Sequence, residues 1–283
     1  MLVRMSFRFK SFLVYKLLEP LKLRVARYSK LISSSPLTTD TDFVGLVSII
    51  LPTFNRSEIL FSRAIPSVLN QTYKNWELLV VAHGCTDSTI TKVERLSSED
   101  PRVRLIKVAR GDLGYPPSAE NHWLVGPVKP INAGLDNVSG SWIARIDDDD
   151  EWHSNHLEML LNLLASSGAE FASSSYQVDM YGDRQVFPPK GEPRVGGVQT
   201  WLYRSYMRFF RANINSWQKK WNRVNDTDLQ ERFVYSGVKF AYTDEVTVTI
   251  RPRPGEKNIG SKAYLSDKVR YENKYKAQKS HES

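Results

Sequence analysis

The chain has 283 residues, of which 41% are hydrophobic and 25% charged, so it can bury a globular core and is neither wholly disordered nor collagen-like. No apolar run approaches the roughly 18 residues of a membrane span, and the single cysteine, Cys85, excludes an internal disulfide and a cysteine-based zinc site. The net charge of +8 divides into +7 for residues 1–30, −4 for residues 31–250 and +5 for residues 251–283. A nucleic-acid binder with a basic groove in its body is therefore a poor first guess, and we expect no nucleic-acid partner.

The N-terminal segment interleaves apolar and basic residues over positions 6–32, and this pattern predicts an amphipathic helix that is broken or kinked near Pro20. The bases would lie on one side, and the other side would carry Phe12, Leu13, Leu17, Leu21 and Val25. Such a helix suits an anionic membrane surface, but it equally suits packing on the body or on a second copy. Lys10 and Lys16 leave only a short apolar stretch between them, which argues against a secretory signal peptide.

Composition divides the chain into three parts. A small, polar stretch at 33–42 predicts a linker, so we expect a basic N-terminal segment with its linker at 1–42. The body would occupy 43–252, and the Lys- and Glu-rich residues 253–283 would form a basic C-terminal tail. We expect a cytoplasmic protein, and its alternative placement is peripheral, on the cytoplasmic face of a membrane.

The body alternates predicted strands with predicted helices. Short, apolar, β-branched runs predict strands at 47–53, 77–82, 103–108, 141–146 and 170–175. Apolar periodicity predicts helices at 60–69, 86–96 and 154–167. A hairpin turn is predicted near Gly182-Asp183. This alternation favours an α/β fold with a mostly parallel central sheet flanked by helices, and ligands at the carboxyl ends of the strands.

Five consecutive carboxylates, Asp147 to Glu151, directly follow the predicted strand at 141–146. Crowded carboxylates repel one another, so a fold rarely concentrates them without a cation, and oxygen ligands suit Mg²⁺ or Mn²⁺. Because alternate residues of an extended segment point the same way, Asp147 and Asp149 can face one site while Asp148 faces another. The alternative is a solvated acidic turn that caps the following helix.

Four segments together resemble the family 2 glycosyltransferases with the GT-A fold. They are VSIILPTFNR at 47–56, SVLNQTYKNWELLVVAHGCTDST at 67–89, NAGLDNVSGSWIARIDDDDEW at 132–152 and NDTDLQERF at 225–233. The resemblance implies inverting transfer of a sugar from a nucleotide-sugar donor, a UDP-sugar being the first expectation, to an acceptor hydroxyl on a growing or lipid-linked glycan. It also implies that Mg²⁺ or Mn²⁺ binds the donor diphosphate.

The same resemblance assigns roles to individual residues. Pro52, Thr53 and Phe54 would line the nucleoside pocket, with Phe54 stacked on the base. Asp147 and Asp149 match the outer acids of the Asp-x-Asp metal motif, and Asp147 and Asp148 would also face the nucleotide. Asp226 lies where the family has its general base, which must reach the acceptor hydroxyl to remove its proton. Asp228 is the fallback, and a helix N-cap is the alternative role for Asp226.

The chain departs from the family pattern at several places. His83 replaces an acid that typically contacts the base, so it is a candidate nucleotide contact or a surface-loop histidine. Ile131 stands where the family often has an Arg, and Lys129, two residues earlier, is either a diphosphate contact or a solvated lysine. Residues 111–126 form either a mobile lid or a packed loop, and the aromatic-rich stretch 200–223 is either core or a surface for the acceptor.

Two other functions remain open from the sequence. A nucleotidyltransferase would share the nucleotide, the metal and the sheet, but it usually has a Gly-rich phosphate loop, and residues 52–58 contain no glycine. A non-catalytic module that binds glycan or membrane would account for the departures. The Asp147, Asp149 and Asp226 set argues against it, so a metal-dependent glycosyltransferase is our prediction.

Overall fold

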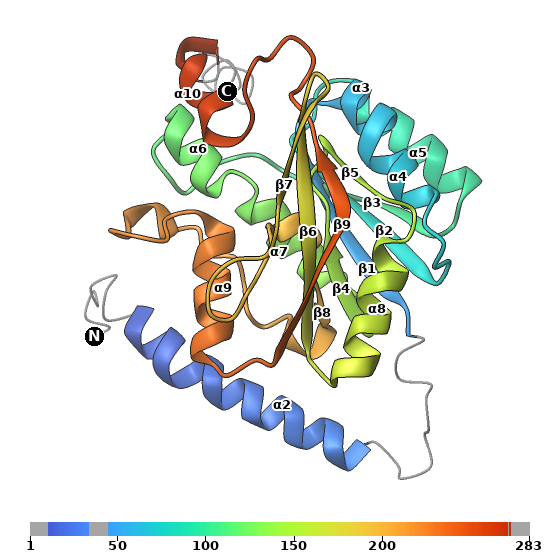
Figure 1. Cartoon of the computed structure of the whole chain (residues 1–283). Coiled ribbons are helices and arrows are strands. Elements are labelled where there is room, and N and C mark those ends of the chain that lie inside the picture. The colour runs from blue at the N-terminus through green and yellow to red at the C-terminus, as the bar shows by residue number, and fades with distance from the viewer. Residues whose placement is uncertain (1–10, 34–44, 271, 273–283) are drawn as a thin grey trace.

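One large sheet organises the molecule. The computed structural model describes residues 11–33, 45–270 and 272. Within these residues nine strands form a sheet of order β3-β2-β1-β4-β8-β6-β9-β5, with β7 paired to β6 (Figure 1). The strands are β1 (Val47–Thr53), β2 (Trp76–His83), β3 (Val103–Val108), β4 (Trp142–Arg145), β5 (Asp150–Trp152), β6 (Phe171–Met180), β7 (Asp183–Phe187), β8 (Leu202–Arg204) and β9 (Phe240–Ile250).

The sheet is mostly parallel, as predicted. Strands β3, β2, β1 and β4 pair in parallel, and so do β6 and β9. The antiparallel strand β8 joins β4 to β6, and β5 and β7 pair antiparallel with β9 and β6. The predicted strands at 47–53 and 103–108 are confirmed to the residue, and the strand predicted at 170–175 continues to Met180 before the hairpin.

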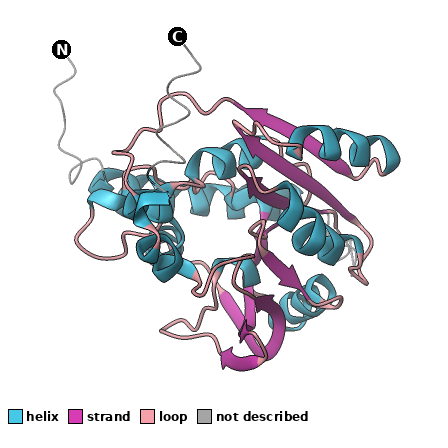
Figure 2. Cartoon of the chain, turned by 90° about the horizontal axis from the view of Figure 1, so that it is seen from above, coloured by secondary structure: helices cyan, strands magenta, loops and turns pink. Residues whose placement is uncertain are grey.

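Helices cover both faces of the sheet (Figure 2). They are α2 (Glu19–Ser33), α3 (Ser57–Ile59), α4 (Ile65–Leu69), α5 (Thr89–Glu99), α6 (Ala119–Val125), α7 (Val128–Asp136), α8 (His156–Ser167), α9 (Asn225–Tyr235) and α10 (Gly260–Ser266). The π-helical turns Val14–Leu18 and Leu60–Ala64 precede α2 and α4, and short 3-10 turns lie at Val198–Thr200, Ser205–Met207 and Ser216–Gln218. In the part of the chain that is described, no helix has both the length and the apolar character to cross a bilayer.

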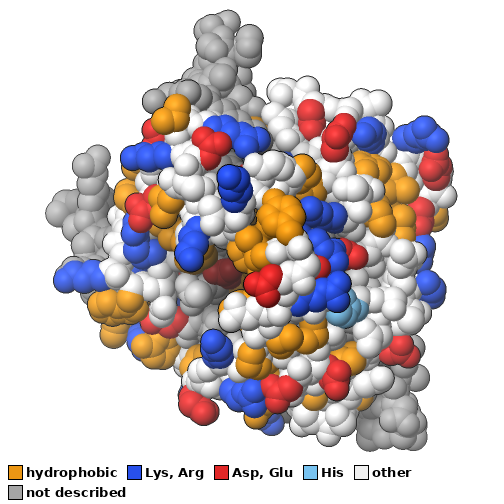
Figure 3. Space-filling view, turned by 45° about the horizontal axis from the view of Figure 1, so that its top comes forward, with side chains coloured by type: hydrophobic (Ala, Val, Ile, Leu, Met, Phe, Trp, Pro, Cys, Tyr) orange, Lys and Arg blue, Asp and Glu red, His pale blue; other side chains and the backbone are white. Residues whose placement is uncertain are grey.

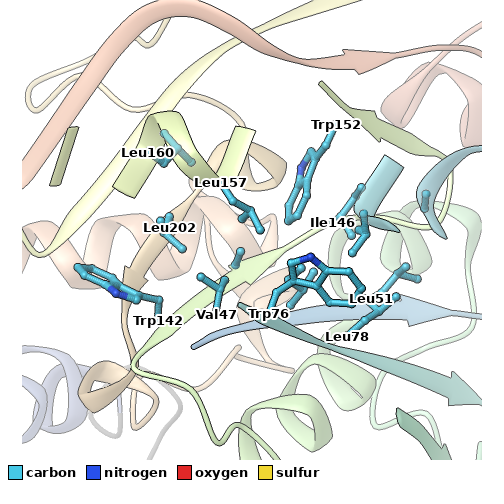
Figure 4. Packing of buried hydrophobic residues seen from close by; sticks show 14 of the residues in the cluster. Val47, Leu51, Trp76, Leu78, Trp142, Ile146, Trp152, Leu157, Leu160 and Leu202 are labelled. Atoms are coloured by element: carbon cyan, nitrogen blue, oxygen red, sulfur yellow. The ribbon is translucent and has the colours of Figure 1, made fainter. Parts of the chain in front are cut away.

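The alternation of side chains along the central strands explains the two layers. Ile49 and Leu51 of β1 point into one cluster, where α4, α5 and α8 supply partners such as Val68, Val93 and Leu160 (Figure 4). Ile50 points to the opposite face, where it packs on α7. Glycine permits this contact, because a Cβ on Gly134 of α7 would lie 2.6 Å from the Ile50 side chain. Since both faces are buried, the strands read as continuous apolar runs rather than as alternating ones.

The N-terminal helix packs on the body. The irregularity predicted near Pro20 is the π-helical turn Val14–Leu18, in which the Glu19 N–H bonds to the Val14 carbonyl five residues earlier. This turn lies just before Pro20, which has no backbone N–H to donate. Leu23 is fully buried in the core cluster that also contains Phe233 of α9. Apart from Ser33, the predicted linker at 33–42 lies outside the described residues.

Candidate active site

The carboxyl ends of β1, β2 and β4 meet at one edge of the sheet and border a cavity of about 470 Å³. On the face shown in Figure 3 the surface is hollowed, with an acidic side chain in the depth of the hollow and Lys and Arg side chains around it. The structure brings every predicted site residue to the wall of this cavity: Pro52, Thr53, Phe54, His83, Asp147, Asp148, Asp149 and Asp226. Parallel strands that end at the same edge produce this convergence.

Asp148 turns inward and is held by two neighbours. Its Oδ2 accepts a hydrogen bond from Thr53 Oγ1 at 2.8 Å, and its Oδ1 pairs with Arg56 Nη1 at 2.6 Å. Burial raises the pKa of Asp148, while the guanidinium of Arg56 opposes that shift. Both carboxylate oxygens therefore already have partners, and Asp148 fixes the wall of the cavity from inside.

Asp147 and Asp149 remain half-buried at the cavity surface, and each pairs with arginine. Arg145 Nη2 lies 2.8 Å from Asp147 Oδ1, whereas Asp149 Oδ2 lies 3.5 Å from Arg56 Nη1 and 3.4 Å from Arg253 Nη1. These arginines offset the repulsion that the sequence predicts for the acidic run.

The donor set fits a metal that is shared with a ligand. Among the described residues, no three His, Cys, Asp or Glu side chains cluster closely enough to enclose a metal ion. Asp147 and Asp149 do supply two carboxylates at one cavity wall. Mg²⁺ is typically bound by one or two carboxylates together with substrate phosphates, so this pair suits Mg²⁺ or Mn²⁺ on a diphosphate.

Asp226 is the second residue of α9 and borders the same cavity as the end of β1. Its Oδ1 accepts a hydrogen bond from the backbone N–H of Thr227 at 2.7 Å. Loss of contact with water raises the pKa of its carboxyl, while nearby Arg145 opposes the shift. Val224 is the N-cap of α9, so the alternative that Asp226 serves as the cap is wrong.

The fallback candidate Asp228 does not border the cavity. It is fully buried, and its carboxylate pairs with Arg232 Nε and with Lys219 Nζ, each at 3.0 Å. Tyr15 Oη donates a further hydrogen bond of 3.3 Å from the N-terminal segment. With these partners Asp228 joins α9 to its surroundings and has no access to an acceptor.

His83, the last residue of β2, borders the cavity. Its side chain is buried, and its Nε2 atom has no hydrogen-bond partner among the residues that the structure describes. Burial, together with the charges of Arg110 and Lys129, lowers the pKa of His83 to about 4, so the ring is neutral at pH 7. The Arg110 guanidinium lies 3.7 Å from the centre of the Phe54 ring. A buried neutral imidazole near this cation–π pair offers a polar contact to a flat ligand.

The segment after β9 forms another wall. Tyr264 of α10 accepts a hydrogen bond of 3.1 Å from Arg56 Nη2 and stacks on His122 of α6, with ring centres 6.1 Å apart. The stretch 111–126 thus contains a short helix that packs against α10. Lys129 donates to the backbone carbonyl of Asp112 and is not among the cavity-lining residues.

Sequence reasoning missed five arginines at the cavity: Arg56, Arg110, Arg145, Arg251 and Arg253. The first three had a usable signal, because each lies at or within three residues of the carboxyl end of a strand that the sequence predicts. Arg251 and Arg253 had none, since they follow β9, a strand that the sequence analysis did not predict. In the aromatic-rich stretch 200–223, Trp201, Tyr203 and Phe210 are buried core residues, which confirms the simpler alternative for them.

Comparison with known proteins agrees with this arrangement. The profile of "Glycosyl transferase family 2" matches residues 48–116 and 119–237. An Escherichia coli protein named UDP-Glc:alpha-D-GlcNAc-diphosphoundecaprenol beta-1,3-glucosyltransferase is 36% identical over 47% of this chain and 46% of its own length. A Campylobacter jejuni protein named GalNAc(5)-diNAcBac-PP-undecaprenol beta-1,3-glucosyltransferase is 33% identical over 41% of this chain and 33% of its own. This chain therefore matches less than half the length of these two relatives.

Two solved structures share the fold. The mannosyltransferase PcManGT from Pyrobaculum calidifontis, in complex with GDP-Man and Mn²⁺, has a TM-score of 0.54 at 14% identity, over 95% of this chain and 74% of its own. TarS 1–349 from S. aureus, in complex with UDP-GlcNAc, has a TM-score of 0.51 at 15% identity, over 75% of this chain and 60% of its own. At such low identity the likeness shows a common fold.

Proposed function

Because the chain belongs to glycosyl transferase family 2 and has the GT-A fold, we propose that its cavity binds a nucleotide sugar and that the protein transfers the sugar, with inversion, to an acceptor hydroxyl. The observation that carries the proposal is the meeting of Asp147, Asp149 and Asp226 in one cavity with the nucleoside candidates Phe54 and His83. A lipid-linked glycan is the proposed acceptor, since the names of both bacterial relatives specify undecaprenol-linked substrates.

Asp149 and Asp147 would hold Mg²⁺ or Mn²⁺ at the donor diphosphate. The oxygen-only ligand set and the position of both acids on the cavity wall support this role. When bound, the metal would supply Lewis-acid assistance to the departing diphosphate. Ion pairs with Arg145 and Arg253 would hold the carboxylates of Asp147 and Asp149 in place. The ion pair between Asp148 and Arg56 would fix the segment that carries these two acids.

Asp226 would act as the general base. Its carboxylate borders the cavity, and its raised pKa makes it a stronger proton acceptor than an ordinary surface aspartate. The Thr227 N–H orients the Asp226 carboxylate through Oδ1, and the Arg145 guanidinium partly balances its negative charge. The other carboxylate oxygen, Oδ2, would then face the acceptor. Asn225, which replaces the usual family glutamate, is structural here, because its amide donates to the Leu124 carbonyl at 3.0 Å.

His83 would read the nucleobase. The unpartnered Nε2 of a neutral imidazole makes one hydrogen bond, as acceptor or donor according to the tautomer, where the family usually has a carboxylate. The Phe54 ring, which Arg110 covers on one face at 3.7 Å, would stack on the base with its other face. UDP-sugars are the first donors to test.

A thermal-shift screen of UDP-, GDP- and CDP-sugars with and without Mn²⁺ tests the donor part of this proposal. We expect one class of nucleotide sugar to raise the melting temperature, and the shift to be larger with Mn²⁺, because binding to the folded state alone stabilises it. The Asp149→Asn variant should keep the fold and lose the part of the melting-temperature shift that depends on Mn²⁺. If no nucleotide sugar shifts the melting temperature in either buffer, the proposed donor site is wrong.

A further inference from the structure

The N-terminal helix, residues 11–33, presents its polar side chains to the body. Every fourth residue makes the contact: Tyr15, Glu19, Leu23 and Arg27. Glu19 pairs with the buried Arg232 of α9 at 2.6 Å, and Arg27 Nε donates to Glu170 at 2.7 Å. Leu23 is the one fully buried apolar side chain among these four. The helix is therefore attached to the body mainly by charged and polar groups.

Its apolar side chains face outward instead. Seven of them have exposed fractions from 36% to 66%: Phe12, Val14, Leu17, Leu18, Leu21, Val25 and Tyr28. Leu17, Leu21 and Val25 each lie two residues from a body-facing residue, which is about 200° around a helix of 3.6 residues per turn. Within the described chain nothing covers this outward face. A contiguous apolar ridge of this kind marks a docking surface, since soluble proteins expose apolar residues singly.

Cations border the ridge on both sides. Lys22 lies about 100° to one side of Leu21 around the helix, and Arg24 lies about 60° to the other. Both side chains are exposed, and residues 1–30 as a whole carry +7. An apolar stripe between basic flanks is complementary to a bilayer that contains anionic lipid.

We propose that this outward face of the helix, Val14 to Tyr28, docks on the surface of an anionic lipid bilayer, with the helix lying parallel to that surface. The inference is independent of the donor site, although it deepens the proposed use of a lipid-linked acceptor. Lys and Arg would meet lipid phosphates while the aliphatic side chains enter the headgroup region.

The fold sets the distance between this face and the candidate base. Figure 1 shows α2 along the end of the molecule opposite to α6 and α10, with α9 running between the two ends. Lys16 lies over the ring of Tyr235, the last residue of α9, and Asp226 lies in its first turn. Eleven residues of helix span about 16 Å, and α2 itself, roughly 10 Å across, lies between the end of α9 and the lipid, so docking would hold Asp226 roughly 25 Å above the lipid surface.

A second copy of the chain is the competing occupant. Val14, Leu18, Leu21, Val25 and Tyr28 follow the alternating spacing of four and three that also suits helix pairing. Two such faces would bring Lys22 and Arg24 of both copies together without an opposite charge on the ridge. Charge therefore favours the bilayer over the dimer.

Vesicle co-sedimentation of the full chain tests the proposal. Leu21→Ser/Val25→Ser changes two outward side chains that are 59% and 58% exposed, and Val186→Ser/Val269→Ser is the matched control, at 50% and 70%. On vesicles of phosphatidylcholine with phosphatidylglycerol, we expect the wild type and the control to sediment and the ridge variant to bind at least about tenfold more weakly. Binding to pure phosphatidylcholine should be weaker for all three.

The outcomes are separable. Equal vesicle binding by the ridge variant and the wild type overturns the proposal. The proposal is also overturned if the wild type does not bind vesicles but forms a dimer in light scattering, and the ridge variant is a monomer. The nucleotide-sugar thermal shift should be the same in all three proteins, so its absence would count against the donor site while leaving the vesicle result to decide the docking face.

Discussion

Replacement of the candidate base by its amide separates chemistry from folding. In Asp226→Asn the new side chain has nearly the same shape, and its amide oxygen still accepts the 2.7 Å hydrogen bond from the Thr227 N–H. Donor affinity and melting temperature should therefore change little. Proton removal is lost, which lowers the rate of transfer by about 10²–10⁴-fold, or roughly 2.7–5.4 kcal/mol of barrier.

Asp228→Asn is the matched comparison, because the same change is made two residues away. Asp228 is fully buried and pairs with Arg232 and Lys219, so the loss of its charge should reduce stability by up to roughly 3–5 kcal/mol. Turnover per folded molecule should stay close to that of the wild type. The assay measures product formation at saturating donor together with urea unfolding. If Asp226→Asn keeps turnover within about tenfold of the wild type, the assignment of the base is refuted.

Three further changes test other parts of the structure. Asp149→Ala should remove the stimulation of transfer by Mn²⁺ and keep the fold, because Arg56 retains Asp148 at 2.6 Å; full Mn²⁺ stimulation in a metal titration would contradict the metal role. His83 has a pKa near 4 in the fold and 6.5 when unperturbed, so the unfolded chain binds its proton more readily and stability should fall between pH 6.5 and 4. His83 accounts for at most about 3 kcal/mol of this loss of stability. We expect His83→Gln to lack that contribution when urea unfolding at pH 7 is compared with unfolding at pH 4. If the variant keeps the pH dependence of the wild type, His83 is not buried as described. Leu23→Ala should cost about 2–5 kcal/mol in urea unfolding, since that side chain is fully buried, and a cost below about 0.5 kcal/mol would show that the helix is not docked.

Sequence patterns predicted the central sheet well, for a physical reason. Strands buried on both faces, such as β1 and β2, must be apolar throughout, and a run as short as VSIILPT is typical of a buried strand because it is too short for most helices. The ends of parallel strands then lie at one edge, so the alternation predicted ligands there, and the family resemblance added Thr53 and the acids at 147–149 to that site.

The orientation of the N-terminal helix was beyond the same reasoning. Periodicity reveals that a helix has two faces, but it does not say which face meets the protein. The face that meets the protein is set by Arg232 and Glu170. These residues lie more than 140 positions along the chain from their partners, Glu19 and Arg27. Arg253 was missed for a similar reason, because only the register of β9 brings it to Asp149.

The configuration of the product tests most directly whether the protein transfers a sugar with inversion. In the proposed mechanism Asp226 is the base and no carboxylate acts as nucleophile, so the acceptor oxygen would attack the face of the sugar opposite the diphosphate. Transfer from an α-linked nucleotide sugar to a lipid-linked glycan acceptor should therefore yield a β-linked product by the coupling of its anomeric proton in NMR. An α-linked product, or no transfer from any nucleotide sugar that binds, would contradict the account.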